Sequence, residues 1–189
     1  MIEKTGNGWK LVSHNQVYSS EYIELYEDEL NINGKKKIYI QGTRKNYSTI
    51  VPFISNKEIL IIKSYRHLVD SVQIEIPSGY IESGETPIEA AVREFKEETG
   101  YVATELKLIG EYTLDYSMFH QRGYIFVAYG IQKKDQQSLG VMEKIEINSL
   151  SIDKIKQLLR EGKILNAASI VALYKAIEYH EERIDKTLV

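Results

Sequence analysis

The feature that most constrains this chain is a helix whose start and end are both indicated by residues 86–100. Thr86 is a good N-cap residue, Pro87 suits the first helical position, and Glu89 completes a capping box with Thr86. Gly100 stands where a left-handed residue ends a helix. Between these ends four apolar residues recur at helical spacing: Ile88, Ala91, Val92 and Phe95. The sequence therefore predicts a helix from about Pro87 to Glu98 that packs one face on the body of the domain.

A second face of this helix carries Glu94, Glu97 and Glu98 next to Arg93. Like charges three or four residues apart cost about 0.2–0.5 kcal/mol per pair, which a solvated acidic face tolerates. The loop 77–79, which follows the apolar run VQIEI, supports another interpretation because it brings backbone carbonyls toward the same carboxylates. Three carboxylates and a carbonyl form an all-oxygen site that suits Mg²⁺ or Mn²⁺ rather than zinc. The residues alone leave both interpretations open, a solvated face and a metal site.

The rest of the chain interleaves strands with helices. Residues 17–41 are expected to form strands that turn at Asn33-Gly34, a pair typical of tight hairpins. The lysines 35–37 fit a solvated hairpin edge better than a basic binding patch. Further strands are expected at STIVPFI, EILIIKSY, VQIEI, 105–114 and 123–130, and helices at 151–161 and 166–182. We therefore expect an α/β (α+β) fold with a β-subdomain over residues 1–45 and a main domain over residues 46–189.

The composition excludes several classes of site and partner. A chain of 189 residues, 43% hydrophobic and 27% charged, suits one soluble globular domain with a small appendage. The net charge of −3 gives no reason to expect nucleic acid or an anionic membrane as a partner. Cysteine is absent, which excludes disulfides, thiolate catalysis and cysteine-bound zinc. The polar N-terminus and the lack of an apolar run of roughly 20 residues predict a cytoplasmic protein.

The residues around the acidic helix resemble a complete Nudix box. Gly79, five residues, Glu85, seven residues and then REFKEETGY fit the pattern G-x5-E-x7-R-E-U-x-E-E-x-G-U, in which U is a bulky apolar residue. Two further stretches are similar to the ADP-ribose pyrophosphatase branch of that family: YR followed by IEIPSG, and EGKILNAASIVAL. This resemblance implies an α/β/α sandwich with a mixed sheet. It also implies an N-terminal antiparallel β-subdomain that mediates contacts in a homodimer.

The resemblance assigns roles to residues of the box. Glu94, Glu97 and Glu98 are the implied ligands of Mg²⁺, or alternatively Mn²⁺, and the backbone carbonyl of Ser78 adds one more. Arg93 is counted with Glu97 among the catalytic residues. It is expected to brace the box through hydrogen bonds, as is Glu85.

Three positions outside the box complete the expected site. The fork of the Arg66 guanidinium suits a phosphate, with a plain surface arginine as the alternative. Glu75 is expected to accept hydrogen bonds from a ribose, with an exposed strand residue as the alternative. The late loop SLGVMEKIEI has Val141 two residues before Glu143, where relatives offer several acids. Glu143 is the best-matched acid left there and is the expected catalytic base, with a plain loop carboxylate as the alternative.

The implied chemistry is Mg²⁺-dependent hydrolysis of the diphosphate bond in a nucleoside diphosphate sugar, with ADP-ribose first, giving AMP and ribose 5-phosphate. The branch's Pro-Gly some fifteen residues past the box is replaced here by LDYSMFHQRG. Alternative substrates therefore include another conjugate such as a GDP-sugar. A non-catalytic module that senses its ligand is a further alternative, although an intact box favours the enzyme.

Histidines and tyrosines are two further residue types that could contribute to a site. His67 and His120 have no partner at ligand spacing and are expected to be ordinary polar residues. Tyr112 and Tyr116 are candidates for stacking on a base, and half-buried strand tyrosines are the simpler interpretation.

Overall fold

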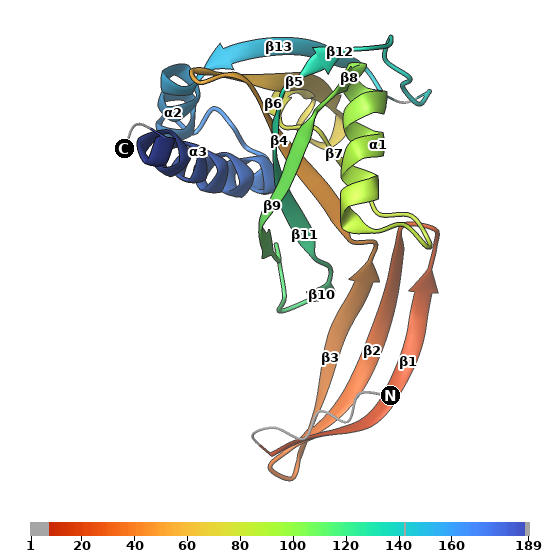
Figure 1. The fold of residues 1–189 in the computed structure, drawn as a ribbon. Helices are drawn as coiled ribbons and strands as arrows, with labels where there is room; N and C mark the ends of the chain where they lie inside the picture. The colour runs from red at the N-terminus through yellow and green to blue at the C-terminus, as the bar shows by residue number, and fades with distance from the viewer. Residues whose placement is uncertain (1–7, 142, 188–189) are drawn as a thin grey trace. The chain divides into compact units, whose positions relative to one another are not determined.

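The computed structural model describes residues 8–141 and 143–187. The described chain packs as two compact units, whose path is shown in Figure 1. The first unit holds the residues up to Asn46 together with Thr113–Arg122, and the second holds Tyr47–Tyr112 and the residues from Gly123 onward. The chain therefore passes between units at 46/47, 112/113 and 122/123. A functional division into residues 1–45 and 46–189 stays a prediction.

The first unit is built on a four-stranded sheet in the order β1-β2-β3-β10. Strands β1 (Trp9–Ser19), β2 (Ile23–Ile32) and β3 (Lys35–Arg44) pair antiparallel, and the short β10 (Phe119–His120) joins β3 in parallel at Gly42 and Thr43. The turn after β2 has Asn33 at φ 51° and Gly34 at φ 85°. Both positions need positive φ in this kind of turn, so the predicted hairpin is confirmed.

The second unit contains a seven-stranded mixed sheet. Its main path runs β13-β5-β4-β11-β9, with β6 paired to β5 and β7 paired to β4. Strands β4 and β11 pair in parallel, and the other pairs are antiparallel. The strands are β4 (Tyr47–Ser55), β5 (Glu58–Arg66), β6 (Ser71–Glu75), β7 (Ser78–Tyr80), β9 (Glu105–Tyr112), β11 (Gly123–Tyr129) and β13 (Ile145–Ser151). A short 3₁₀ turn, His67–Val69, joins β5 to β6, and β8 (Tyr101–Val102) pairs with β12 (Gln132–Lys133).

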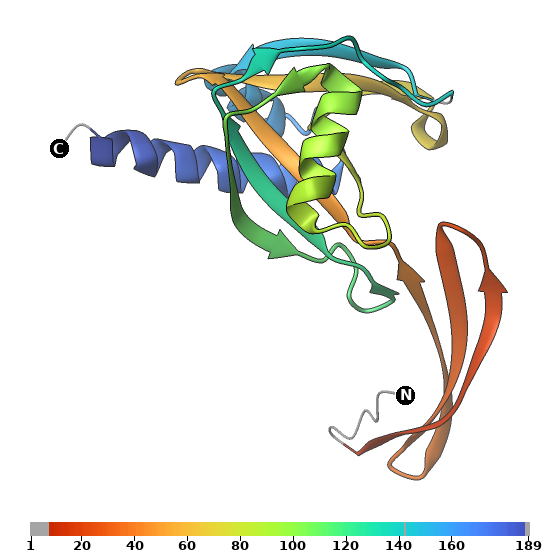
Figure 2. The same ribbon diagram turned by 45° about the vertical axis from the view of Figure 1, so that its right-hand side comes forward.

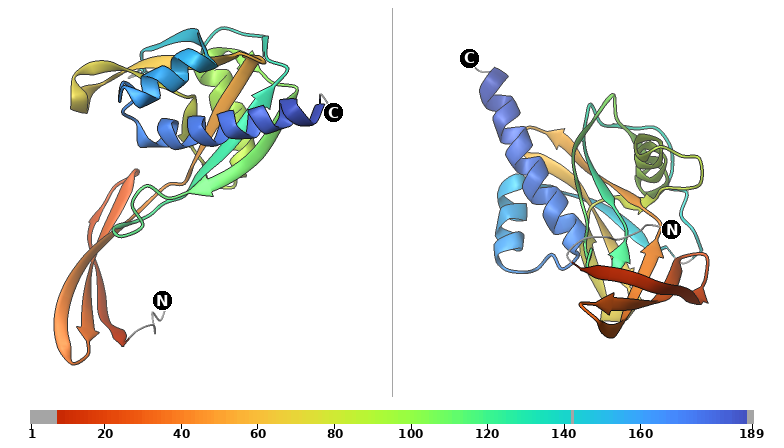
Figure 3. Two further views of the ribbon diagram at one scale, coloured as in Figure 1. Left: turned by 90° about the vertical axis from the view of Figure 1, so that its left-hand side faces the viewer. Right: turned by 90° about the horizontal axis from the view of Figure 1, so that it is seen from below.

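Helices cover both faces of this sheet because its central strands are apolar on both sides. Successive residues of a strand point to opposite faces. Accordingly Val51 packs with one buried cluster and Ile50 with the other, and β5 and β11 divide in the same way. One cluster lies under α1 (Pro87–Thr99), and the other lies under α2 (Ile152–Arg160) and α3 (Ala167–Thr187). Figure 2 and Figure 3 show α1 on one side of the sheet and α3 on the other. The expected α/β/α sandwich with an antiparallel N-terminal sheet is confirmed.

The predicted helices and most of the long strands agree with the structure. Strand β1 begins at Trp9, ahead of the expected start at residue 17, and the short strands β7, β8, β10 and β12 lie where no strand was expected. The predicted helices at 87–98, 151–161 and 166–182 correspond to α1, α2 and α3, of which α3 runs five residues further. The segment Thr113–Arg122 was not assigned to the first unit, because its pairing with β3 links residues some 77 positions apart. No helix in the described part of the chain is long and apolar enough to cross a membrane.

Candidate active site

Helix α1 is fixed at both ends by the residues that predicted it. The Thr86 side chain accepts a hydrogen bond from the Glu89 N–H at 3.4 Å, and the Glu89 carboxylate accepts one from the Thr86 N–H at 2.8 Å. Gly100 adopts φ 72° and donates its N–H to the Lys96 carbonyl at 2.7 Å. Ser48 of β4 also donates to the Pro87 carbonyl at 2.7 Å. The register of the acidic face relative to the sheet is therefore determined.

The glycine of the box allows β7 to approach the acidic face closely. A Cβ atom at Gly79 would lie 1.9 Å from the Glu94 carboxyl carbon, so any side chain there would displace Glu94. The neighbouring Ser78 donates its backbone N–H to Glu98 Oε2 at 2.9 Å. The predicted meeting of the loop 77–79 with the carboxylates of α1 therefore exists. The observed contact uses the Ser78 N–H, whereas the prediction used its carbonyl.

Arg93 ties the box together. Its Nε and Nη2 donate to the two Glu85 oxygens at 2.8 and 2.9 Å, and Nη2 also reaches the Tyr80 carbonyl at 2.9 Å. Its Nη1 donates to Glu94 at 2.6 Å and to Glu97 at 3.3 Å. The bidentate pair with Glu85 raises the pKa of Arg93, so this cation stays charged, and it lowers the pKa of Glu85 in turn. Arg93 contacts four groups of the box, which is the bracing arrangement expected from the sequence.

Two carboxylates of the acidic face are buried beyond what an ordinary surface helix shows. Glu98 is 6% exposed. Burial raises the pKa of Glu98 well above its usual value, and the charges of Glu94 and Glu143 act in the same direction, whereas the Ser78 N–H and Arg66 oppose it. Burial also raises the pKa of Glu94, although Arg93 opposes this. A face that was merely solvated would not bury Glu98, so the solvated-face interpretation holds only for the more exposed Glu97.

Glu143 lies in the loop before β13, and this loop meets the end of α1 where Gln137 donates to both the Glu98 and the Ile145 carbonyls. The Glu143 carboxylate accepts the Gly140 N–H at 2.8 Å, and its own N–H donates to the Gly140 carbonyl at 3.0 Å. The side chain is exposed. The structure therefore brings the expected base to the same region as the acidic face of α1.

Arg66 and Glu75 form a pair across the β5–β6 hairpin. Nε of Arg66 donates to both Glu75 oxygens at 3.0 and 3.1 Å, and Nη2 donates to Oε2 as well. Glu75 is 4% exposed, so the alternative of an exposed strand residue is wrong. Asn166, at the start of α3, donates to Glu75 Oε1 at 3.4 Å and accepts the Ser169 N–H at 3.0 Å. Glu75 thus holds Arg66, and about half of the Arg66 side chain remains exposed.

The donors fit a hard cation chemically, although they are not gathered as a ligand shell. Within residues 8–141 and 143–187, no three histidine, aspartate or glutamate side chains converge on one point as metal ligands. Glu94 and Glu97 turn toward Arg93, and Glu98 turns toward Ser78. Buried, mutually repelling carboxylates with only oxygen donors are what Mg²⁺ or Mn²⁺ prefers, because its charge offsets both the burial and the repulsion.

The remaining candidate residues share no hydrogen bond or ring contact with the carboxylates of α1 within the described residues. His67 is exposed in the 3₁₀ turn, and His120 Nε2 lies 2.9 Å from Gln41 Oε1 within the first unit. The Tyr112 ring packs edge-on against the Tyr47 ring, with 5.7 Å between the ring centroids. Tyr116, in the first unit, is 86% exposed. That both histidines are ordinary polar residues stays a prediction. Tyr112 is a strand residue that packs on a neighbour, and of the two tyrosines only Tyr116 presents an open ring.

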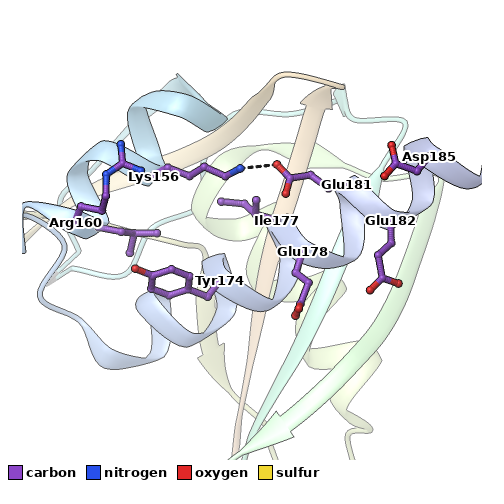
Figure 4. A pocket seen from close by; sticks show the side chains of 9 residues that line it. Lys156, Arg160, Tyr174, Ile177, Glu178, Glu181, Glu182 and Asp185 are labelled. Atoms are coloured by element: carbon purple, nitrogen blue, oxygen red, sulfur yellow. Dashed lines mark hydrogen bonds and ion pairs between the residues drawn. The ribbon is translucent and has the colours of Figure 1, made fainter.

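Two hollows have opposite charge. One of about 580 Å³ lies between α2 and α3, and its lining includes four acids of α3 and two cations of α2. Figure 4 shows Lys156 reaching Glu181, to which it is paired at 2.5 Å. The acidic wall of this hollow repels a diphosphate. The other, of about 630 Å³, lies in the first unit. It is lined by residues 43–46, Thr113, Tyr116 and 119–122, which include three cations and no acid. The lining residues of the second hollow thus carry a net positive charge, and those of the first carry a net negative charge.

Sequence reasoning missed two residues of this region. Asn166 lies in the stretch EGKILNAASIVAL that was compared with relatives, so a signal was present without a role. Gln137 had no signal at all. Its side chain donates to the Glu98 carbonyl at 2.6 Å and to the Ile145 carbonyl at 3.3 Å, a contact that depends on how the loop folds back on α1.

Comparison with known proteins gives one consistent answer. The family model described as NUDIX domain matches residues 44–172. The methanol dehydrogenase activator of Bacillus methanolicus is 25% identical over 166 residues, and the ADP-ribose pyrophosphatase of Bacillus subtilis (strain 168) is 24% identical over 166 residues. Each alignment covers 87% of this chain and 90% of the relative. A solved structure described as an ADP compounds hydrolase superposes with a TM-score of 0.83 at 22% identity, covering 93% of this chain and 95% of the other. Because the family model spans more than half of the chain, including α1 and the loop before it, this protein belongs to the NUDIX domain family.

Proposed function

We propose that the protein is a Mg²⁺-dependent hydrolase of the diphosphate bond in nucleoside diphosphate sugars, with ADP-ribose as the first substrate. The observation that carries this proposal is the buried Glu98 among Glu94, Glu97 and Glu143, a concentration of carboxylate charge that needs a cation. In the reaction a water oxygen bonds to one phosphorus and the bridging P–O bond breaks. AMP and ribose 5-phosphate are the two products.

In the proposed site, Glu94, Glu97, Glu98 and the Ser78 carbonyl hold the cation. When bound, Mg²⁺ neutralises the phosphate oxygens and lowers the pKa of a water. Arg93 keeps Glu94 and Glu97 on one side of α1, because a single guanidinium group donates to both. The Ser78 N–H fixes the orientation of Glu98.

Two residues outside α1 act on the substrate in this proposal. Nε and Nη2 of Arg66 donate hydrogen bonds to Glu75. Among the described residues Nη1 makes no hydrogen bond, so the Nη1 edge of the guanidinium group is available to a phosphate. Glu143 accepts the proton of the attacking water. Glu75 holds Arg66 in place, and its hydrogen bond to a ribose stays part of the proposal.

Other functions of the same box remain as alternatives. The relatives include an ADP compounds hydrolase of Escherichia coli (strain K12), 29% identical over 119 residues, and a protein named an activator of another enzyme. Hydrolysis of another conjugate, such as a GDP-sugar, and ligand sensing without cleavage are therefore the two competing proposals. Product analysis separates all three.

The test is incubation with Mg²⁺ and a panel of ADP-ribose, other ADP compounds and GDP-sugars, with chromatography of the products. We expect AMP and ribose 5-phosphate from ADP-ribose and no turnover in excess EDTA. Carrying out the reaction in H₂¹⁸O identifies the attacked phosphorus, because the label enters only one of the two products. Tight binding without any product from the whole panel would support the sensing module, and full turnover in EDTA with metal content checked would refute the metal mechanism.

A further inference from the structure

The last turn of α1 ends in backbone carbonyls that the helix itself leaves without partners, as every α-helix does at its C-terminus. Here they are taken by the loop that follows β12. The Ser138 N–H donates to the Glu97 carbonyl at 2.8 Å, and the Gln137 side chain donates to the Glu98 carbonyl at 2.6 Å. These two carbonyls belong to two of the proposed metal ligands.

The start of the same loop is fastened to the residue that ends α1. The N–H groups of Lys134 and Asp135 both donate to the Gly100 carbonyl, at 3.0 and 3.1 Å. A Cβ atom at Gly100 would lie 2.3 Å from the Asp135 carbonyl oxygen, so this approach requires a glycine. The loop therefore packs directly on the end of the helix.

Gln137 connects the end of α1 to the segment that carries Glu143, the proposed catalytic base. Its amide nitrogen donates also to the carbonyl of Ile145, the first residue of β13, at 3.3 Å. Glu143 lies two residues before Ile145, inside a small loop closed by the reciprocal hydrogen bonds between Gly140 and Glu143. One side-chain amide thus ties both ends of the loop 138–144 to the helix that carries Glu94, Glu97 and Glu98.

We propose that Gln137 is a positioning residue that sets the place of the Glu143 carboxylate relative to the acidic face of α1. The inference rests on the proposed function. Gln137 touches neither substrate nor metal in this account, and it acts only through the loop. A displacement of about 1 Å in a catalytic group can lower the rate on the order of 100-fold. The two hydrogen bonds of the Gln137 side chain therefore matter to the reaction.

The chain offers a matched pair of variants for the test. Q137M keeps the length of the side chain and removes both donors. Q136M makes the same change at the adjacent residue, which is exposed and makes no side-chain hydrogen bond within the described residues. We expect Q137M to lower kcat about 10- to 100-fold with KM within about twofold, and Q136M to leave both unchanged. Q137E, which also lacks the donors, serves as a second variant if Q137M folds poorly.

The decisive measurement is a double-mutant cycle with E143Q. If Gln137 acts through Glu143, adding Q137M to E143Q lowers kcat by less than about twofold more, because the base is already lost. Equal losses in the two backgrounds would overturn the inference, and so would a Q137M enzyme with wild-type kcat.

Hydrogen exchange of residues 138–145 separates this inference from the proposed function. We expect hydrogen exchange of these residues to be faster in Q137M than in Q136M. Equal rates would show that the Gln137 side chain does not hold the loop on α1. If the wild type cleaves no conjugate, the proposed function is wrong and the positioning role falls with it. The exchange result would then still decide whether Gln137 holds the loop.

Discussion

Glu98 carries the strongest conflict between burial and charge in the acidic cluster. Burial raises its pKa, so in the metal-free fold the protonated form is favoured relative to the unfolded chain. The stability that this group contributes is fully present below its unfolded pKa of about 4.3 and is lost as the pH rises through the higher folded value.

We predict that Glu98→Gln stabilises the metal-free protein at neutral and higher pH, yet lowers kcat at least about 100-fold. Gln keeps an oxygen acceptor for the Ser78 N–H and carries no charge to bury. Thermal unfolding in EDTA at pH 5 and pH 8, with Mg²⁺-dependent kinetics, checks both parts. An active variant with unchanged metal affinity would remove Glu98 from the proposed metal ligands.

A second prediction concerns Arg66. Arg66→Ala should raise KM about 10-fold or more and lower kcat less, because a phosphate contact already present in the bound substrate contributes mainly to uniform binding. Steady-state kinetics on the best substrate measure this. Arg160→Ala, on the exposed side of α2, is the control that should leave KM unchanged. Unchanged KM in Arg66→Ala would assign Arg66 to the surface after all.

Sequence reasoning succeeded where residues act through near neighbours in the chain. Glu94, Glu97 and Glu98 share a helix face by spacing alone, and Gly79 was part of the same motif. Arg66 and Glu75 were both predicted as site residues, but their pairing depends on the β5–β6 hairpin and was not predicted. The ribose contact of Glu75 stays a prediction. Gln137 was missed because its partners belong to α1 and β13, which come together only in the folded chain.

At the scale of elements, local signals again decide what was predictable. Helix α1 was predicted to within a residue because its cap, its proline and its terminal glycine act within the helix. Strand β10 was missed because two residues with no periodicity pair with a distant strand. The strands β4, β5 and β11 were expected as strands. That both of their faces are covered follows from their continuous apolar runs, which are typical of buried strands.

Helix α3 docks on the sheet through His180. The imidazole ring stacks on the Phe53 ring, with 3.9 Å between the ring centroids. Its Nδ1 lies 3.2 Å from the Tyr129 hydroxyl oxygen, and its Nε2 lies 3.3 Å from the Asn56 carbonyl oxygen. Burial lowers the pKa of His180, and nearby Arg183 adds to this, while the Asn56 carbonyl and Glu181 oppose it. The stability from this neutral ring is present above the unfolded pKa of about 6.5 and is lost as the pH falls through the lower folded value.

We therefore predict that His180→Phe reduces the loss of stability between pH 7.5 and pH 5, because Phe keeps the stacking and cannot bind a proton. Urea midpoints at the two pH values measure this. His67→Gln, in the exposed 3₁₀ turn, is the control and should leave the pH dependence as in the wild type. A His180→Phe protein with the full acid-induced loss would show that other groups cause it.

At the scale of the whole molecule, the first unit's sheet exposes apolar side chains on β1 and β3. Ile38 and Ile40 are two residues apart on β3 and so point to the same face, and Val12, Val17 and Tyr18 of β1 are exposed as well. The residues directly beside Ile38 and Ile40 on β2 are Glu29 and Glu27, so this face mixes apolar and acidic side chains. We propose that this sheet pairs two copies of the chain, as the resemblance to relatives implied.

We predict a homodimer of about twice 21.8 kDa by light scattering at working concentrations. The double substitution of Ile38 and Ile40 by Lys should shift it to a monomer, because it would bury two charges in the interface. Tyr174 is an exposed residue that lines the hollow between α2 and α3. Tyr174→Lys is therefore the matched control, and we expect this variant to remain dimeric. A wild-type mass of one chain would contradict the prediction.

The return of the chain to the first unit at Thr113–Arg122 has a consequence for how this protein can be recombined. Strand β10 pairs with β3, and Gly42 of β3 leaves room for Phe119, whose ring would lie 2.7 Å from a Cβ atom there. In a chimera that takes residues 1–46 from a relative, Phe119 of this chain would therefore have to pack against the β3 strand of the relative. An exchange of the N-terminal strands of this chain therefore has to include residues 113–122 as a second piece.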